Sequence, residues 1–273
     1  MKPFVHIRPK KGWQAVDLGE LGQYRDLFYF LVTRDIKVKY KQTVLGGLWA
    51  IIQPFFSMVV FTLFFGKLAK MPSDGLPYPI FNFTAMVAWI YFANAVTGSG
   101  NSLIGNTNLI SKVYFPRVII PLTSVLAGLP DFLIAFAVLV GMMSYFHIYP
   151  TPMTLFVPFL IVLMMLTSGG VGMILAALNA KYRDIRYTIP FLVQLWMFAS
   201  PIVYPASMVP EKYRLIYALN PMTGVIEGFR SALLGTVAFP AQMILVSTTV
   251  SVILFTVGMF YFRQVERYFA DII

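Results

Sequence analysis

A short basic segment stands directly before the first long apolar run of the chain. Residues 34–41, with the sequence RDIKVKYK, contain four cationic side chains: Arg34, Lys37, Lys39 and Lys41. Cations at a membrane surface fix the orientation of the helix that follows and attract anionic lipid headgroups. The segment is therefore a candidate lipid-headgroup and interface site, and anchoring of the following helix alone is the simpler interpretation.

Side chains that carry out catalysis or bind metal ions are scarce. The chain has no cysteine and only two histidines, His6 and His147, which lie far apart in the sequence. It contains no P-loop, GxGxxG, HExxH or GxSxG pattern. We therefore expect this chain to have no catalytic residue, no metal site and no cofactor of its own.

One carboxylate falls inside an apolar run. Asp131 follows Pro130 and lies within the run that begins near residue 119. A charged carboxylate at the centre of a bilayer costs about 2.5–3.5 kcal/mol on insertion scales. We expect Asp131 to face the interior of the helix bundle or a polar cavity, with a functional role and a structural hydrogen bond both open.

The composition indicates an integral membrane protein. Of the 273 residues, 58% are hydrophobic and only 12% are charged, against about 25% charged in soluble domains. The net charge of +10 comes from residues between the hydrophobic runs, so we do not expect nucleic-acid binding.

Six apolar runs are each close to the ~20 residues that cross a bilayer. They cover residues 44–66, 80–100, 119–146, 153–178, 188–204 and 239–262. The sequence thus predicts an all-α polytopic membrane protein with a six-helix transmembrane domain at 44–262. Residues 205–238 are too polar to span and too apolar for an ordinary loop, which predicts short re-entrant helices before the last span.

Residues 1–43 form an N-terminal segment with one helical pattern. From about residue 21, apolar residues recur at the spacing of one helix face: Tyr24, Leu27, Phe28, Leu31 and Val32. The pattern predicts an amphipathic helix in the membrane interface. Docking of the same face on protein is the alternative.

The distribution of cations predicts the orientation in the membrane. Of the 21 Lys and Arg residues, 16 lie in segments on the N-terminal side, namely 1–43, 101–118, 179–187 and 263–273. Cytoplasmic loops carry the excess of Lys and Arg. We therefore expect both termini to be cytoplasmic, with 263–273 as a cytoplasmic tail.

Two features of the spans bear on packing. Ser168, Gly172 and Ala176 recur every fourth residue, with Gly169 and Gly170 beside them, a spacing that lets helix backbones approach closely. Packing within the chain is the favoured interpretation and a dimer seam the alternative.

The first two spans are also rich in aromatic residues. Most of these residues are expected to face lipid or other helices. The candidates to line a conduit are Trp49, Phe56, Tyr91 and Phe92.

Four stretches, in order along the chain, carry a resemblance to a known family. They are RDIKVKYKQTVLGGLWAIIQP (34–54), NLISKVYFPRVIIPL (108–122), LNAKYRDIRYTIPFLVQLWMFASPIVYP (178–205) and LNPMTGVIEGFRSALLG (219–235). The chain resembles the membrane subunit of bacterial ABC exporters that move lipid-linked polysaccharide, which include O-antigen, teichoic-acid and capsule exporters.

The resemblance implies partners and sites. It implies a homodimer in the bacterial cytoplasmic (inner) membrane, bound to two copies of a cytoplasmic ABC ATPase that holds ATP and Mg²⁺. The coupling segment would be 105–118, as a short helix at 108–117, joined by the next cytoplasmic loop; the residues are Asn108, Lys112, Tyr114, Phe115, Pro116, Arg117, Lys181, Arg183 and Arg186. Gate helices at the outer face would include Asn220, Pro221, Glu227 and Arg230, with a salt bridge between the last two.

The expected function is a channel-forming permease that exports undecaprenyl-pyrophosphate-linked polysaccharide, in particular O-antigen. The basic segment at 34–41 would then also contact the pyrophosphate of the substrate. A drug or small-lipid ABC exporter with the same fold is the alternative. A membrane glycosyltransferase or acyltransferase would need clustered carboxylates or histidines, and only Asp131 lies deep in a span.

Overall fold

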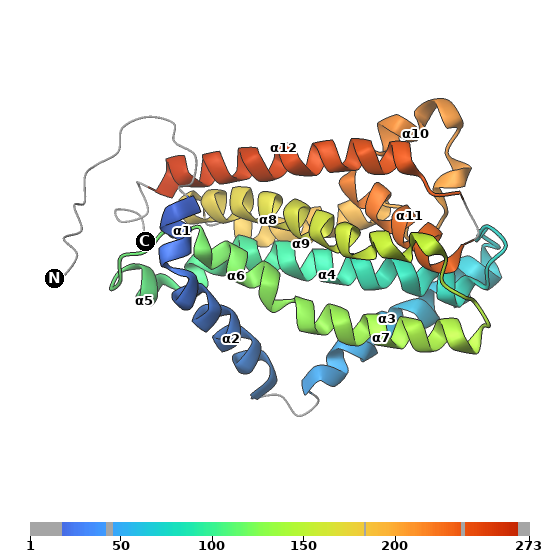
Figure 1. The fold of residues 1–273 in the computed structure, drawn as a ribbon, viewed down its shortest axis with the longest axis horizontal. Coiled ribbons are helices and arrows are strands. Elements are labelled where there is room, and N and C mark those ends of the chain that lie inside the picture. The colour runs from blue at the N-terminus through green and yellow to red at the C-terminus, as the bar shows by residue number, and fades with distance from the viewer. Residues whose placement is uncertain (1–17, 42–45, 183, 236–237, 267–273) are drawn as a thin grey trace.

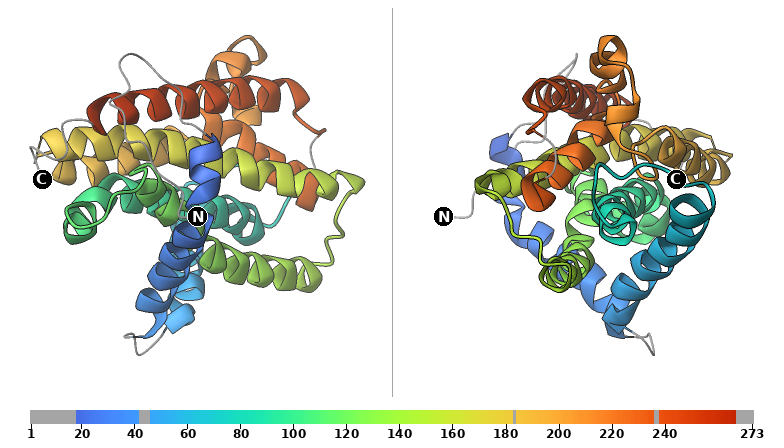
Figure 2. Two further views of the ribbon diagram at one scale, coloured as in Figure 1. Left: turned by 60° about the vertical axis from the view of Figure 1, so that its left-hand side comes forward. Right: turned by 90° about the vertical axis from the view of Figure 1, so that its right-hand side faces the viewer.

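The structure is a computed structural model that describes residues 18–41, 46–182, 184–235 and 238–266. Those ranges are helical and contain no β-strand, which confirms the all-α prediction. Most of the long helices run along one axis and form an elongated bundle, and the helices near the N-terminus are inclined to that axis (Figure 1). Figure 2 shows the same bundle from two further directions, the right-hand view looking along that axis.

Within these described ranges, five helical stretches are long and apolar enough to cross a membrane: Gly46–Leu68, Tyr78–Gly105, Ile119–Tyr145, Pro152–Lys181 and Ala241–Glu266. They correspond to five of the six predicted spans. The first comprises η1 (Gly46–Leu48), α3 (Trp49–Phe61) and η2 (Thr62–Leu68); the second is α4 (Tyr78–Gly105); the third comprises α6 (Ile119–Ala127) and α7 (Leu129–Tyr145); the fourth comprises η3 (Pro152–Phe156) and α8 (Val157–Lys181); the last is α12 (Ala241–Glu266).

The fifth predicted span, 188–204, is not confirmed as a single helix. Helix α9 covers only Ile185–Phe198, about 21 Å at 1.5 Å per residue. Proline lacks a backbone N–H and restricts the residue before it, so the helix ends ahead of Ser200 and Pro201. The chain nevertheless reaches the far end of the bundle, because Tyr78 Oη, at the start of α4, donates a hydrogen bond of 2.8 Å to the carbonyl of Val203.

Short helices complete the described chain. On the N-terminal side they are α1 (Leu18–Gln23) and α2 (Arg25–Lys41), and α5 (Thr107–Ile110) lies between the second and third spans. Before the last span lie η4 (Ala206–Met208), α10 (Glu211–Tyr217) and α11 (Pro221–Leu234). Short helices at 205–238 are thus confirmed, and every residue of α11 is buried.

Helix α4 forms the centre of the bundle. It packs against α3, α6, α7, α8, α9 and α11, and residues 80–89 are all buried. Its aromatic side chains make the core: the Phe92 ring lies 5.0 Å from that of Trp196 in α9, and the Tyr91 ring lies 5.6 Å from that of Phe132 in α7. These six helices are therefore positioned by their contact with α4.

The stripe of small residues in α8 packs within the chain, as the favoured interpretation predicted. A Cβ atom on Gly170 would lie 2.6 Å from the carbonyl carbon of Leu254 in α12, and one on Gly172 would overlap Ser99 in α4. Real Cβ atoms do not come that close, so glycine is what allows α8 to touch both neighbours. Gly258 of α12 in turn faces the backbone of Gly170.

The apolar face of α2 packs against protein, which corrects the expectation that this face lies in the membrane interface. Leu31 is 2% exposed and sits in a cluster with Leu103, Ile110, Phe115 and Ile119, against which Tyr24, Leu27 and Phe28 also pack. The periodicity identified the face, but it could not distinguish lipid from protein as the apolar partner. The exposed large apolar side chains of α2 are Tyr29, Phe30 and Val38.

We predict that Gly170→Ala destabilises the protein, because its new methyl group would overlap the backbone of α12. Overpacking of this kind costs about 1–3 kcal/mol. The measurement is the thermal unfolding midpoint of the purified protein in detergent, with Gly141→Ala as control, since a Cβ on Gly141 of α7 meets nothing within 4 Å. Equal midpoints for the two variants would contradict the prediction.

Candidate functional site

The four cations of the basic segment divide into two kinds in the structure. Lys37 and Lys41 are exposed on α2, where they can meet anionic groups. Arg34 instead binds within the chain: its guanidinium donates hydrogen bonds of 2.9 and 2.7 Å to Asp35 and one of 2.8 Å to the side-chain oxygen of Asn106. Arg34 therefore joins α2 to the end of α4, and a contact of Arg34 with a lipid headgroup stays a prediction.

Asp131 is engaged by the same helix. Lys39 forms an ion pair with one oxygen of this carboxylate, and the hydroxyl of Tyr40 donates to the other. Burial raises the pKa of Tyr40, and the adjacent Asp131 raises it further, so the phenol stays protonated as a donor. The structural hydrogen bond, one of the two roles left open for Asp131, is present, and its partners lie on α2 and not in the interior of the bundle.

The candidate conduit aromatics also divide. Tyr91 and Phe92 are 4% and 0% exposed, and the Tyr91 hydroxyl donates to the Val125 carbonyl at 3.0 Å. They belong to the core in this conformation and do not line a path, which corrects their prediction. Trp49 and Phe56 are 54% and 61% exposed on α3, and for them the prediction stands.

The coupling segment 105–118 is mostly a loop. The predicted helix at 108–117 is only α5, Thr107–Ile110, so its extent is corrected. Asn108 and Lys112 are exposed, and Tyr114 is 67% exposed. These three side chains are placed where a partner protein can reach them.

Two other residues of the segment face inward. Phe115 is 3% exposed in the cluster beneath α2, so the predicted aromatic pair is split between core and surface. The backbone N–H of Arg117 donates to the Glu266 carboxylate at 2.9 Å, and its guanidinium donates to the Glu266 carbonyl at 2.9 Å. Arg117 thus holds the end of α12, and Pro116 stands at the turn into α6, where its carbonyl accepts from Ile119.

The second predicted loop lies at the same end of the bundle. Asn179 near the end of α8 donates to the carbonyl of Gly100 near the end of α4, at 2.9 Å. Lys181 and Arg186 are exposed, and the Lys181 ammonium lies 5.2 Å from the Tyr182 ring centre. Arg183 falls outside the described residues. Figure 1 shows α2, α5 and the final turns of α8 and α12 gathered at one end of the molecule.

At the opposite end, the predicted gate residues satisfy a break in the backbone. Asn220, just before Pro221, caps α11 by accepting from the Met222 N–H at 3.1 Å. Its side-chain oxygen also accepts from Trp196 at 2.8 Å, and its nitrogen donates to the carbonyl of Ala199 at 3.0 Å. A single side chain therefore joins the end of α9 to the start of α11.

Glu227 and Arg230 form a buried ion pair of 2.9 Å, which confirms the predicted salt bridge. Arg230 also donates to the Ile202 carbonyl at 3.0 Å and stacks on the Phe81 ring, with 3.5 Å from Cζ to the ring centre. Glu227 accepts from the backbone N–H of Ala206 at 3.1 Å. The pair thereby binds both sides of the non-helical segment between α9 and α10, while a part in gating remains a prediction.

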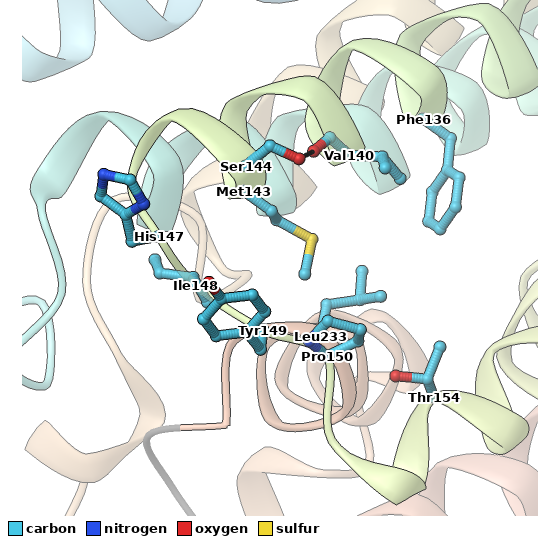
Figure 3. A pocket seen from close by; sticks show the side chains of 10 residues that line it. All are labelled: Phe136, Val140, Met143, Ser144, His147, Ile148, Tyr149, Pro150, Thr154 and Leu233. Carbon is cyan, nitrogen blue, oxygen red and sulfur yellow. Dashed lines mark hydrogen bonds between the residues drawn. The ribbon is translucent and has the colours of Figure 1, made fainter.

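A cavity of about 310 Å³ lies near the end of α7 (Figure 3). It is lined mainly by apolar side chains of α7, the loop after it and α11: Phe136, Val140, Met143, Ser144, His147, Ile148, Tyr149, Pro150, Thr154 and Leu233. His147 adopts a left-handed backbone conformation, with φ of 54°. Nine of its ten lining residues lie between positions 136 and 154, and Leu233 of α11 closes it from a distant part of the chain; nothing in the sequence pattern predicted this cavity.

We predict that Arg230→Met destabilises the protein strongly. The change leaves the Glu227 carboxylate buried without its cation and removes the donor to Ile202, and breaking one side of a buried pair costs about 3–5 kcal/mol. Thermal unfolding in detergent measures the effect. The control is Glu211→Gln, which removes an exposed pair at 3.7 Å on α10; a loss no larger than that of the control would refute the prediction.

Comparison with known proteins agrees with the resemblance of the four stretches. Residues 26–234 match the model of the ABC-2 type transporter family. The chain is 28% identical to the O-antigen export system permease protein RfbA of Myxococcus xanthus, over 92% of this chain and 97% of that protein. It is 29% identical to the RfbA protein of Klebsiella pneumoniae, over 93% and 97%.

A more distant relative carries a different cargo in its name. The polysialic acid transport protein KpsM of Escherichia coli is 24% identical over 75% of this chain and 80% of its own length. The family match covers α2 to α11, and with them the basic segment, the coupling segment and the buried pair of α11. This chain belongs to the ABC-2 type transporter family.

Proposed function

We propose that the chain is the permease half of an ABC exporter of lipid-linked polysaccharide, with undecaprenyl-pyrophosphate-linked O-antigen as its cargo. The observation that carries the proposal is similarity along nearly the whole chain, 92–93% of it, to permeases named for O-antigen export. The similarity to a polysialic acid transport protein supports the broader class of polysaccharide cargo.

The energy for transport comes from a partner. The sequence contains no P-loop, so nucleotide hydrolysis belongs to a separate cytoplasmic ABC ATPase that holds ATP and Mg²⁺. Two copies of the permease with two copies of the ATPase make the working transporter. ATP binding closes the ATPase pair, and the coupling loops pass that movement to the helices.

The end of the bundle that carries α5 is the cytoplasmic end in this proposal. The exposed cations Lys112, Lys181 and Arg186 lie there, and Lys and Arg are enriched on the cytoplasmic side of membrane proteins. The described chain both begins and ends near this end (Figure 1). Both termini are then cytoplasmic, in the bacterial inner membrane.

Lys37 and Lys41 are the candidate contacts for the pyrophosphate of the lipid-linked substrate. Both are exposed on α2, just ahead of the first span. Ammonium groups at a membrane surface attract anionic headgroups. The exposed rings of Trp49 and Phe56 on α3 lie close behind in the sequence, where they offer stacking surfaces to sugar rings.

Deletion of the gene tests the proposed cargo. We expect the lipid-linked polysaccharide to be made but retained on the cytoplasmic side, because synthesis does not need the permease. Cell fractionation and staining of surface polysaccharide measure its location, and a plasmid-borne copy of the gene is the control. Normal surface polysaccharide in the deletion strain would overturn the proposal and favour a drug or small-lipid exporter.

We predict that Tyr114→Ala weakens binding of the ATPase about tenfold or more, since truncation of a buried interface tyrosine often removes at least 1.4 kcal/mol. Titration of the purified permease with the ATPase measures the affinity. Tyr149→Ala is the matched control, because Tyr149 is 80% exposed but lies at the other end of the bundle. Equal affinities of the two variants would remove Tyr114 from the interface.

A further inference from the structure

Helix α2 contacts three other parts of the molecule: the coupling segment, the junction of α4 and α5, and the start of α7. Its N-terminal half packs through Leu31 on an apolar cluster that contains Phe115 of the coupling segment. A movement of the coupling segment must therefore either carry α2 with it or break this packing, since close-packed side chains transmit displacement.

The second contact lies at the junction of α4 and α5. Asn106 stands between these two helices, and its side-chain oxygen accepts from Arg34 at 2.8 Å. Its side-chain nitrogen donates to the Ser102 carbonyl at 2.9 Å, which fixes the orientation of the amide. Arg34 thus connects α2 to Asn106, the residue between α4 and α5 at the start of the coupling segment.

The third contact lies at the break in the third span. Helix α6 ends at Ala127 and α7 begins at Leu129, with Pro130 in its first turn. Proline cannot continue the hydrogen-bond ladder of the preceding helix. Asp131, the next residue, binds Lys39 and Tyr40 of α2. Helix α2 therefore contacts α7 immediately after the break between α6 and α7.

We propose that α2 is a strut that passes movement of the coupling segment to the kink of the third span, through Arg34 and Asn106 at one end and Lys39 and Asp131 at the other. The inference rests on the proposed function, because it assumes that an ATPase moves the coupling segment. A helix is stiff over this length, so a shift at residue 34 reaches residue 39, about 7.5 Å further along the axis.

The contacts suit transmission better than stabilisation. The Lys39 and Asp131 side chains are 48% and 19% exposed, and ion pairs in such settings contribute little to folding. These two contacts do fix the position of α7 relative to α2, because Lys39 and Tyr40 of one helix bind both oxygens of the Asp131 carboxylate. The strut also carries Lys37 and Lys41, so the substrate-facing cations move together with the kink.

The experiment compares export with ATP hydrolysis in cells of the source bacterium that express the permease with its ATPase. We expect Asp131→Asn to leave ATP hydrolysis in isolated membranes within twofold of wild type while surface polysaccharide falls about tenfold. The charge-swapped pair Lys39→Asp with Asp131→Lys should restore export. Asp26→Asn is the control, because Asp26 is on the same helix and its side chain is 95% exposed.

Two results would overturn the inference. One is wild-type export and hydrolysis in Asp131→Asn. The other is a parallel fall of both with a lower amount of protein in the membrane, unrelieved by the charge swap, which would make the contact purely structural. Absence of polysaccharide export by the wild-type chain would instead overturn the proposed function.

A measurement that does not depend on the cargo tests the strut directly. The chain has no cysteine, so spin labels at Val38→Cys on α2 and Leu133→Cys on α7 are the only ones present, and both sites are exposed. Labelled chain diluted into unlabelled chain reports distances within one copy. We expect a single narrow distance that broadens in Asp131→Asn and narrows again in the charge swap; an unchanged distribution in Asp131→Asn refutes the strut.

Discussion

A backbone inside an apolar bundle must find all its hydrogen-bond partners within the protein, and the end of the molecule that carries α11 is organised around that constraint. A helix satisfies most of its own backbone hydrogen bonds, but the chain between Phe198 and Glu211 is largely non-helical. Among the side chains that supply the missing partners, three belong to α11 or its N-cap: Asn220 binds the Ala199 carbonyl, Arg230 binds the Ile202 carbonyl, and Glu227 binds the N–H of Ala206. The complete burial of α11 is what places these groups beside the break.

The same constraint shapes the opposite end in a different way. Helices that end there leave carbonyls without partners within the helix, and the Arg117 guanidinium binds the carbonyl of Glu266, the last described residue of α12. Asn179 of α8 donates to the carbonyl of Gly100 in α4. The fourth span is thereby fastened to the second, and the segment that leads into the third span is fastened to the last.

Local patterns predicted what depends on local geometry. Hydropathy located five spans, helical periodicity found the buried face of α2, and the spacing of small residues found the packing stripe of α8. The partners of Asp131 and Arg117 lie 91, 92 and 149 residues away, and no periodicity encodes such pairings. Tyr91 and Phe92 were misplaced for a related reason, since an aromatic ring suits a core and a conduit equally well. The length of α9 was overestimated because hydropathy continues smoothly past Phe198, whereas the helix does not.

Residue type alone also could not separate structural cations from available ones. The sequence analysis placed Arg34, Lys39 and Arg117 among the candidate contacts of lipid or partner, but all three bind within the chain. Lys39 is exposed but paired with Asp131, and the other exposed candidate cations are Lys37, Lys41, Lys112, Lys181 and Arg186. These five form two groups, one on α2 beside the first span and one in the loop after α5, at the end of α8 and at the start of α9. Two separate groups of cations suit two different anionic partners, a lipid headgroup and an acidic protein surface, and α2 is the element that connects them.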